Sequence, residues 1–340
     1  MNPACSRFRL IVGKDFGITR KDACRAALKW LPAERKGDFM VAERLSGFHP
    51  KAVIWKTAQQ KHFMLVGSSN LSAAAFEGNV EANASAEVLP PIFEQAREWI
   101  DWIEDRCVPM SEDWLEHYVE ASRESKGSGG KNKALVEHAL TVQLRLPKPK
   151  AIADLLNDRR KMLQAYDAKR EAIFRLFRKC ARGDIDNATF YEQIGQLWGS
   201  EAGNRLQGLG WERKGKSANF RELGEAFVTI IGAAKRQRDD VVREQLDKLK
   251  AAGNPARQAF FSEMLCLRFP QEYPVLNKPV KAFLSEIQFA GPRGASEGTK
   301  YIDLARKLRA ALKANPEYPA KNLAELDILF WADSDRKQSR

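Results

Sequence analysis

The chain has 340 residues and a net charge of +12, with 44% hydrophobic and 9% aromatic residues. This apolar content is enough for buried cores, which excludes a disordered or fibrous chain, and the length suggests two domains or three small ones. No apolar run approaches the ~20 residues of a membrane-spanning helix, and the first residues lack an apolar stretch of signal-peptide length. We therefore expect a cytoplasmic protein without membrane contact.

The basic charge is concentrated in the C-terminal two-thirds. Residues 1–122 contain 15 Lys and Arg against 17 Asp and Glu, whereas the remainder contains 41 against 27. Such an excess is typical of a module that contacts a polyanion. The five cysteines are scattered without any CxxC spacing. We therefore expect no disulfide framework, no metal site and no cofactor.

Strand and helix patterns alternate in the first third of the chain. Short apolar runs predict strands at 8–12, 38–43, 48–56, 62–66 and 80–88. Helices are expected at 19–31, 71–77, 90–106 and 112–122, where apolar residues follow helical spacing. These elements predict an α/β domain over residues 1–122, with a mixed sheet flanked by helices.

A polar, Gly-rich stretch at 123–133 is typical of a linker. Beyond it, helical patterns dominate, at 150–181, 187–198, 221–252, 256–267, 279–289, 299–314 and 323–331. We therefore expect a basic, all-α domain over residues 134–340 that binds nucleic acid or a partner.

Several basic and aromatic residues of this domain have two interpretations. One long helix is strongly basic, with the run Arg159-Arg160-Lys161 and further cations after it. Such a helix is equally consistent with a face in contact with solvent and with a surface that binds a polyanion. Trp198 and Trp211 are able to stack on bases, although packing in the core is favoured. The remaining histidines outside the segment described next, namely His62, His117 and His138, are expected to be structural.

Three short segments of the first domain carry the residues suited to chemistry. His49 and Lys51 should lie side by side, because residues i and i+2 of a strand share a face. The turn Gly67-Ser68-Ser69-Asn70 follows a predicted strand and precedes a short helix, where backbone N–H groups favour an anion. A nucleophile, a cation, an amide and a phosphate-binding turn are what a metal-free phosphodiesterase needs.

This pattern resembles the HKD motif of the phospholipase D superfamily, and most closely its single-motif, metal-independent nuclease branch, which includes restriction endonucleases. The matching residues are His49-x-Lys51, Gly67-Ser68-Ser69-Asn70, the hydroxyl residue Ser72, and Asn79-x-Glu81 eleven positions after Asn70. The resemblance spans roughly residues 8–106. It implies four catalytic residues, namely His49 as the nucleophile, Lys51 and Asn70 as phosphate ligands, and Glu81, which would orient the histidine of its own or of the facing motif. Ser68 is a further phosphate ligand, and Gly67, Ser69 and Ser72 take supporting positions.

The resemblance also implies a reaction and an assembly. Relatives cleave DNA through a phosphohistidine intermediate, and a role in bacterial restriction or antiphage defence would follow, with other subunits of a defence complex as further partners. A second histidine is needed to protonate the leaving oxygen. Because the chain has one His-x-Lys segment with Gly-Ser-x-Asn behind it, we expect a homodimer that forms a shared site through this domain.

Two features depart from the family pattern, and two other functions stay open. Lys56 stands where the full motif has Asp, a replacement also common among the restriction-enzyme relatives. Only 48 residues precede His49, fewer than in most relatives, which leaves the completeness of the fold open. The alternatives are a non-catalytic dimer that serves as a scaffold and, less favoured, an enzyme that acts on phospholipids.

Overall fold

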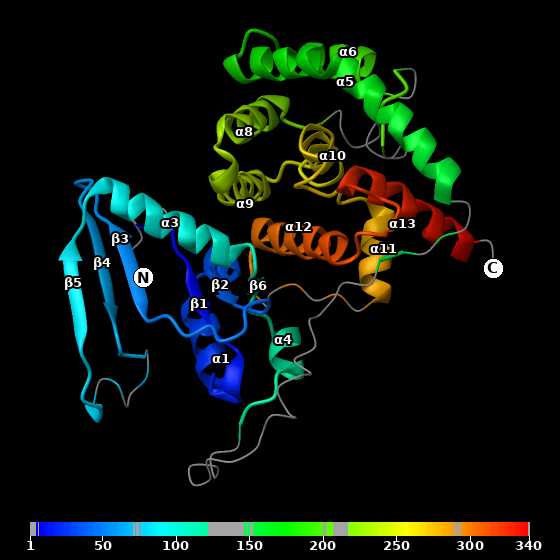
Figure 1. Cartoon of the computed structure of the whole chain (residues 1–340). Helices are drawn as coiled ribbons and strands as arrows, with labels where there is room; N and C mark the ends of the chain where they lie inside the picture. Colours follow the sequence, from blue (N-terminus) through cyan, green and yellow to red (C-terminus); the bar gives the residue numbers. More distant parts are fainter. Residues whose placement is uncertain are drawn as a thin grey trace.

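The computed structural model describes residues 7–70, 77–121, 152–199, 202–206, 217–287 and 294–338, with a few single residues between these ranges. Figure 1 shows the strands gathered at one side of the molecule and the helices of residues 152–338 at the other. An α/β region is therefore followed by a helical region. The predicted linker at 123–133, like His138 and Trp211, lies outside the described residues.

A small sheet forms around the chain's first strand. It has the order β1-β2-β6, in which β1 (Leu10–Val12) runs parallel to β2 (Phe39–Val41) and β2 runs antiparallel to β6 (Val108–Pro109). Helices α1 (Lys21–Trp30) and α4 (Glu112–His117) supply side chains that pack with β2 in one apolar cluster. All three residues of β2 are buried, which makes this strand the centre of the region.

A second sheet carries the segments that hold the candidate site residues. It has the order β3-β4-β5 and is antiparallel throughout, with β3 at Ala52–Lys56, β4 at His62–Gly67 and β5 at Asn83–Glu87. Helix α3 (Pro90–Glu104) packs against β4, where Phe93 contacts the ring of His62. The described strands therefore form two sheets, whereas a single mixed sheet was expected. Strand β2 pairs with β1 on one side and with β6 on the other, and among the described strands none of the three pairs with the second sheet.

The helical region follows the predicted order with one correction. The residues expected as one helix over 221–252 form two, α8 (Phe220–Gly232) and α9 (Lys235–Ala251), because Ala233 and Ala234 adopt extended backbone angles between them. The other helices are α5 (Ile152–Arg182), α6 (Asn187–Leu197), α10 (Ala259–Arg268), α11 (Lys278–Glu286), α12 (Glu297–Ala314) and α13 (Leu323–Gln338). Among the described helices, none is both long and apolar enough to span a membrane.

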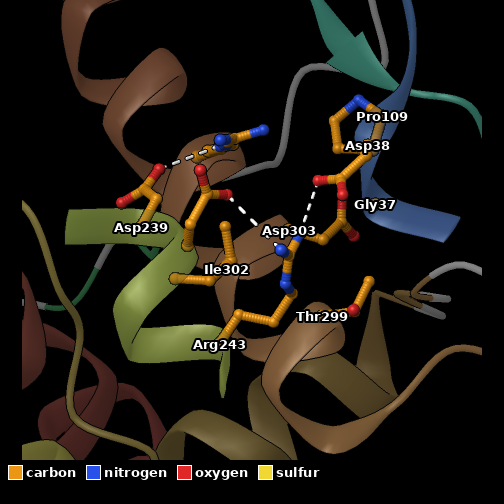
Figure 2. A pocket seen from close by; sticks show the side chains of 10 residues that line it. Gly37, Asp38, Pro109, Asp239, Arg243, Thr299, Ile302 and Asp303 are labelled. Atoms are coloured by element: carbon orange, nitrogen blue, oxygen red, sulfur yellow. Dashed lines mark hydrogen bonds and ion pairs between the residues drawn. The ribbon is translucent and has the colours of Figure 1, made fainter. Parts of the chain in front are cut away.

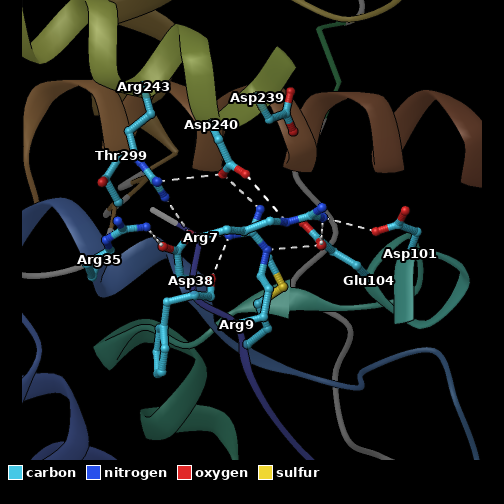
Figure 3. A network of polar contacts seen from close by, with 12 residues as sticks. Arg7, Arg9, Arg35, Asp38, Asp101, Glu104, Asp239, Asp240, Arg243 and Thr299 are labelled. Atoms are coloured by element: carbon cyan, nitrogen blue, oxygen red, sulfur yellow. Dashed lines mark hydrogen bonds and ion pairs between the residues drawn. The ribbon is translucent and has the colours of Figure 1, made fainter. Parts of the chain in front are cut away.

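The two regions meet across a layer of buried charge, which Figure 3 shows between β1, α3, α9 and the 3-10 helix η2 (Ala33–Asp38). Arg9 of the segment that leads into β1 reaches three carboxylates, Glu104 at 3.0 Å and Asp38 and Asp240 at 2.8 Å each. Arg243 of α9 also pairs with Asp38. We call this layer the charged junction, and it joins the two regions through ion pairs.

A small cleft opens at the same junction, as Figure 2 shows. Its lining includes Asp239 and Arg243 from α9 and Thr299 and Asp303 from α12. Burial raises the pKa of the Asp303 carboxyl, which pairs with Lys307 at 3.0 Å. No residue of the family pattern lines this cleft, so it is separate from the candidate site.

Candidate active site

The antiparallel register of β3, β4 and β5 brings the segments of the family pattern to one end of the sheet. Gly67 donates its backbone N–H to the carbonyl of Lys51 at 3.1 Å, which extends the β3–β4 ladder to Lys51. Ser68 donates its N–H to the carbonyl of Ala82 at 3.0 Å, beside Glu81. Contacts across 16 and 14 positions of sequence therefore bring the three segments together in the fold.

His49 and Lys51 contact each other directly, as the spacing in sequence predicts. The Nζ atom of Lys51 lies 2.7 Å from Nδ1 and 3.2 Å from Nε2 of His49. An ammonium group donates only to a ring nitrogen that carries no proton, so the nitrogen that accepts from Lys51 depends on the tautomer of the ring. A nucleophile for phosphorus needs such an unprotonated nitrogen.

The carboxylate of Glu81 lies close enough to Lys51 to feel its charge, and it is held by two hydrogen bonds. The Ser68 hydroxyl donates to Glu81, and Asn79 donates its amide to the same carboxylate at 3.1 Å. The hydrogen bonds from Ser68 and Asn79, together with the charge of Lys51, lower the pKa of the Glu81 carboxyl. Glu81 therefore stays ionised at neutral pH. Its hydrogen bonds go to Ser68 and Asn79, whereas the resemblance leads us to expect a role in orienting a histidine.

Asn83 was missed from sequence and is built into the turn at Gly67. Its amide donates to the Ser69 hydroxyl at 2.7 Å, and its Oδ1 accepts the Ser69 N–H at 3.4 Å. A Cβ atom on Gly67 would lie 1.9 Å from that same oxygen. Gly67 is therefore required so that Asn83 can reach Ser69 and hold the turn. No sequence signal marked Asn83, because asparagine is ordinary beside strands.

Asp15 also contributes, from outside the segments that the sequence singled out. Its Oδ2 accepts the backbone N–H groups of Gly47 at 2.7 Å and Phe48 at 3.1 Å. Gly47 has a φ of +71°, a conformation that glycine adopts without strain. Asp15 thus fixes the turn that directly precedes His49.

The two remaining residues of the pattern lie in the turn that follows β4. Asn70 is exposed, and its carbonyl accepts the N–H of Ser72 at 2.9 Å. Ser72 is also exposed and accepts the N–H of Ala75. The helix predicted at 71–77 lies partly outside the described residues. Both residues are therefore at the same end of the sheet as Ser68.

The site is open to solvent. His49, Ser68 and Asn70 are exposed, and Lys51 and Glu81 are half-buried. Lys56, which stands in the position of the family's aspartate, is exposed at the far end of β3, opposite His62 in the ladder. A site of this kind can bind an extended polyanion, but one chain provides little shelter from water.

The structure decides between the two interpretations of several helical residues. Trp198 is 1% exposed and belongs to the core, as favoured from sequence. Arg159 is 1% exposed and pairs with the buried Asp327 at 3.0 Å, which excludes it as a polyanion contact. Exposed cations follow further along α5, at Arg175, Arg178, Lys179 and Arg182. These four residues form the basic end of α5.

Neither a metal site in the described residues nor a similar protein identifies the function of this site. Within the described ranges, no group of three or more His, Cys, Asp or Glu side chains is placed to hold a metal ion, and the expectation of a metal-free site stays a prediction. Family models, curated proteins and solved structures give no match to this chain. The functional argument therefore depends on the residues and their geometry.

Proposed function

We propose that this chain is a metal-independent phosphodiesterase of the phospholipase D type that cleaves DNA through a phosphohistidine at His49. The observation that carries the proposal is the meeting of His49, Lys51, Ser68 and Glu81 at one end of the β3–β4–β5 sheet. An imidazole, a cation and hydroxyl and amide donors together suit attack on a phosphodiester. A role in restriction or antiphage defence remains part of this proposal.

The reaction would run in two displacements. The unprotonated ring nitrogen of His49 attacks phosphorus, a P–N bond forms, and the bond from phosphorus to the leaving oxygen breaks. The phosphate replaces His49 as the acceptor of the Lys51 ammonium, which frees the ring nitrogen for attack. Water then attacks phosphorus, the P–N bond breaks, and His49 regains its electron pair.

Both displacements need a second acid and base. An acid must protonate the leaving oxygen in the first step, and its conjugate base must take a proton from water in the second. His62 packs against Phe93, and His117 contacts the carbonyl of Asp113 at 2.8 Å, so both have structural surroundings. Among the described histidines, none other than His49 faces the site, and a second copy of the chain would supply its own His49, which is why the proposal includes a homodimer.

The basic end of α5 offers a surface for DNA outside the site. Arg178 and Lys179 lie three and four positions after Arg175, and Arg182 lies three positions after Lys179, so the four cations lie along one side of the helix. Lys and Arg side chains that neutralise phosphates supply most of the non-specific affinity for DNA. We therefore assign this surface to DNA binding.

The test is cleavage of end-labelled single- and double-stranded DNA in excess EDTA. The native protein, His49→Ala and the control His117→Ala are compared; His117 is an exposed histidine in α4, away from the site. The proposal expects cleavage that survives chelation in the native protein and in the control, and that is lost in His49→Ala.

Two results would contradict the proposal. Cleavage that needs a divalent metal would exclude the phosphohistidine route. Equal cleavage by His49→Ala would exclude His49 as the nucleophile. A native protein that binds DNA without cleaving it, with or without metal, would favour the scaffold alternative.

A further inference from the structure

One face of the β3–β4–β5 sheet carries a stacked aromatic pair, an exposed tryptophan on a half-buried phenylalanine, on the strands that lead to the candidate site. Trp55 on β3 and Phe63 on β4 are ladder partners whose rings stack with centroids 5.2 Å apart and an interplanar angle of 11°. Trp55 is 38% exposed, and Val53 on the same face is 51% exposed. We call Trp55 and Phe63 the aromatic platform. Apolar rings left in water beside a polar site are typical of a binding surface.

The platform and Lys51 share one face of the sheet. Side chains two positions apart on a strand point to the same side, so Lys51, Val53 and Trp55 form one row. The opposite face is the one that α3 approaches, through the contact between His62 and Phe93. The row therefore runs from the candidate site directly to the platform, along a face that α3 leaves open.

The charge around the platform matches a polyanion. Residues 44–76, which include the whole β3–β4 hairpin, contain four Lys and Arg and no Asp or Glu. The carboxylate that β5 adds opposite Phe63 is Glu87, and it pairs with Lys61 at 3.3 Å. A strand with phosphates along its backbone would therefore meet Lys51 at one end of this face, whereas Lys56 lies on the opposite face, paired with His62 in the ladder.

The spacing along β3 suits a nucleic acid. Lys51 and Trp55 are four residues apart, which corresponds to ~14 Å at ~3.4 Å per residue. Stacked nucleotides repeat every ~3.4 Å along one strand, so the platform lies within about four nucleotides of a phosphate at Lys51. Bases of a duplex have their faces covered by neighbours, whereas an unpaired base offers its face to an aromatic ring.

We propose that Trp55 and Phe63 form a stacking subsite for an unpaired base close to the phosphate held at the candidate site, and that the substrate strand is single-stranded there. This inference rests on the proposed function, because it uses Lys51 as the phosphate ligand. It adds that the substrate is single-stranded at the site and that one of its bases stacks on the aromatic platform.

The test measures binding of a fluorescent single-stranded oligonucleotide by anisotropy, in EDTA and in a His49→Ala background that prevents cleavage. An abasic residue is placed at each position of the oligonucleotide in turn. We expect one or two adjacent abasic positions to weaken binding about 10-fold, the loss of one stacked base. Trp55→Ala should weaken binding of the intact oligonucleotide equally and should remove the effect of the abasic positions.

Two further variants control for folding and for the general loss of a tryptophan. Trp55→Phe keeps an aromatic ring and should restore most of the affinity. Trp99→Ala removes a tryptophan of α3 that is 44% exposed, and it should bind like the parent protein. The native protein is assayed for cleavage of the same oligonucleotide in parallel.

Several results would overturn the inference. They are an abasic scan without any position dependence, a duplex bound as tightly as the single strand, or a Trp55→Ala protein that binds like its parent. If the Trp55→Ala protein is a monomer where its parent is a dimer, and the parent binds abasic and intact strands alike, this face of the sheet is the contact with a second copy of the chain. If the native protein cleaves DNA but no abasic position weakens binding, the proposed function stands and the stacking subsite is excluded. If one or two abasic positions weaken binding but the native protein does not cleave, the stacking subsite stands and the proposed phosphodiesterase activity is contradicted.

Discussion

Replacing Arg9 with Met should strongly destabilise the protein, because this side chain lies at the centre of the charged junction. Arg9 is 9% exposed and lies within 3.0 Å of carboxylates on Asp38, Glu104 and Asp240. Removing one partner of a buried ion pair costs ~3–5 kcal/mol, since the other charge stays buried. Each of the three carboxylates keeps another arginine as a partner. We therefore expect a loss near the lower limit, about 3 kcal/mol.

The assay is urea unfolding followed by circular dichroism, with the free energy of unfolding extrapolated to water. The matched control is Lys161→Met, which breaks a pair with Asp158 in which both side chains are more than half exposed. Such surface pairs contribute ~0–1 kcal/mol. The reasoning is refuted if Arg9→Met and Lys161→Met have the same free energy of unfolding.

The same junction predicts how stability depends on pH. Burial opposes the charged forms of Glu104 and Asp240, but the neighbouring arginines outweigh it and lower the pKa of both carboxyl groups. A lowered pKa in the folded state gives stability that is present above the unfolded values of ~4 and is lost as pH falls further. Arg9→Met should therefore lose less stability than the native protein when the pH is lowered from 5 to 3.

Three further predictions concern the site, the core and the DNA surface. Gly67→Ala places a Cβ atom 1.9 Å from Oδ1 of Asn83, so we expect the turn to shift and the cleavage rate to fall at least 10-fold, measured on end-labelled DNA; an unchanged rate would contradict the role of the turn. Burial raises the pKa of Glu263 to about 8, so its carboxyl group is neutral in the fold and stability should fall between about pH 5 and 8. Glu263→Gln should lose that slope in melting temperature against pH, and a retained slope would assign it to other groups. Replacing Arg175 and Arg178 with Glu should make the plot of log DNA affinity against log salt concentration less steep by about 2. An unchanged steepness would show that DNA binds at another surface.

The strands around the site were predictable because their pattern is local. Alternating and apolar runs located β3 and β4 to within a few residues, and Lys51 lies beside His49 as expected, although both residues precede β3, which begins at Ala52 and not at residue 48. The antiparallel pairing of β4 with β5, which brings Ser68 close to Glu81, was not predicted, because a long connection separates Gly67 from Asn83. The predictable features need only neighbours in sequence.

Contacts between distant segments were not predictable from this one sequence. Asp15 reaches the turn at Gly47 across 32 positions, and Asn83 reaches Ser69 across 14. An aspartate and an asparagine fit many surroundings, so neither residue type signals its partner. The charged junction was missed for the same reason, since Arg9 and Asp240 are 231 positions apart and charged residues are usually expected at the surface.

The helix break between α8 and α9 was also missed. The residues from 221 to 252 contain no proline, and Gly232 is followed by two alanines, which are the best helix formers. The chain turns there because Phe227 and Leu246 both belong to one core cluster, which requires the two segments to fold back on each other. Tertiary packing thus overrides the local preference.

The central claim, a covalent intermediate at His49, is tested most directly by trapping it. The native protein is mixed with a short DNA strand in EDTA, quenched in alkali, where the P–N bond survives, digested and analysed by mass spectrometry. The account predicts a nucleotide adduct on the peptide that contains His49 and no adduct in His49→Asn. DNA cleavage without such an adduct, or an adduct on another residue, would contradict it.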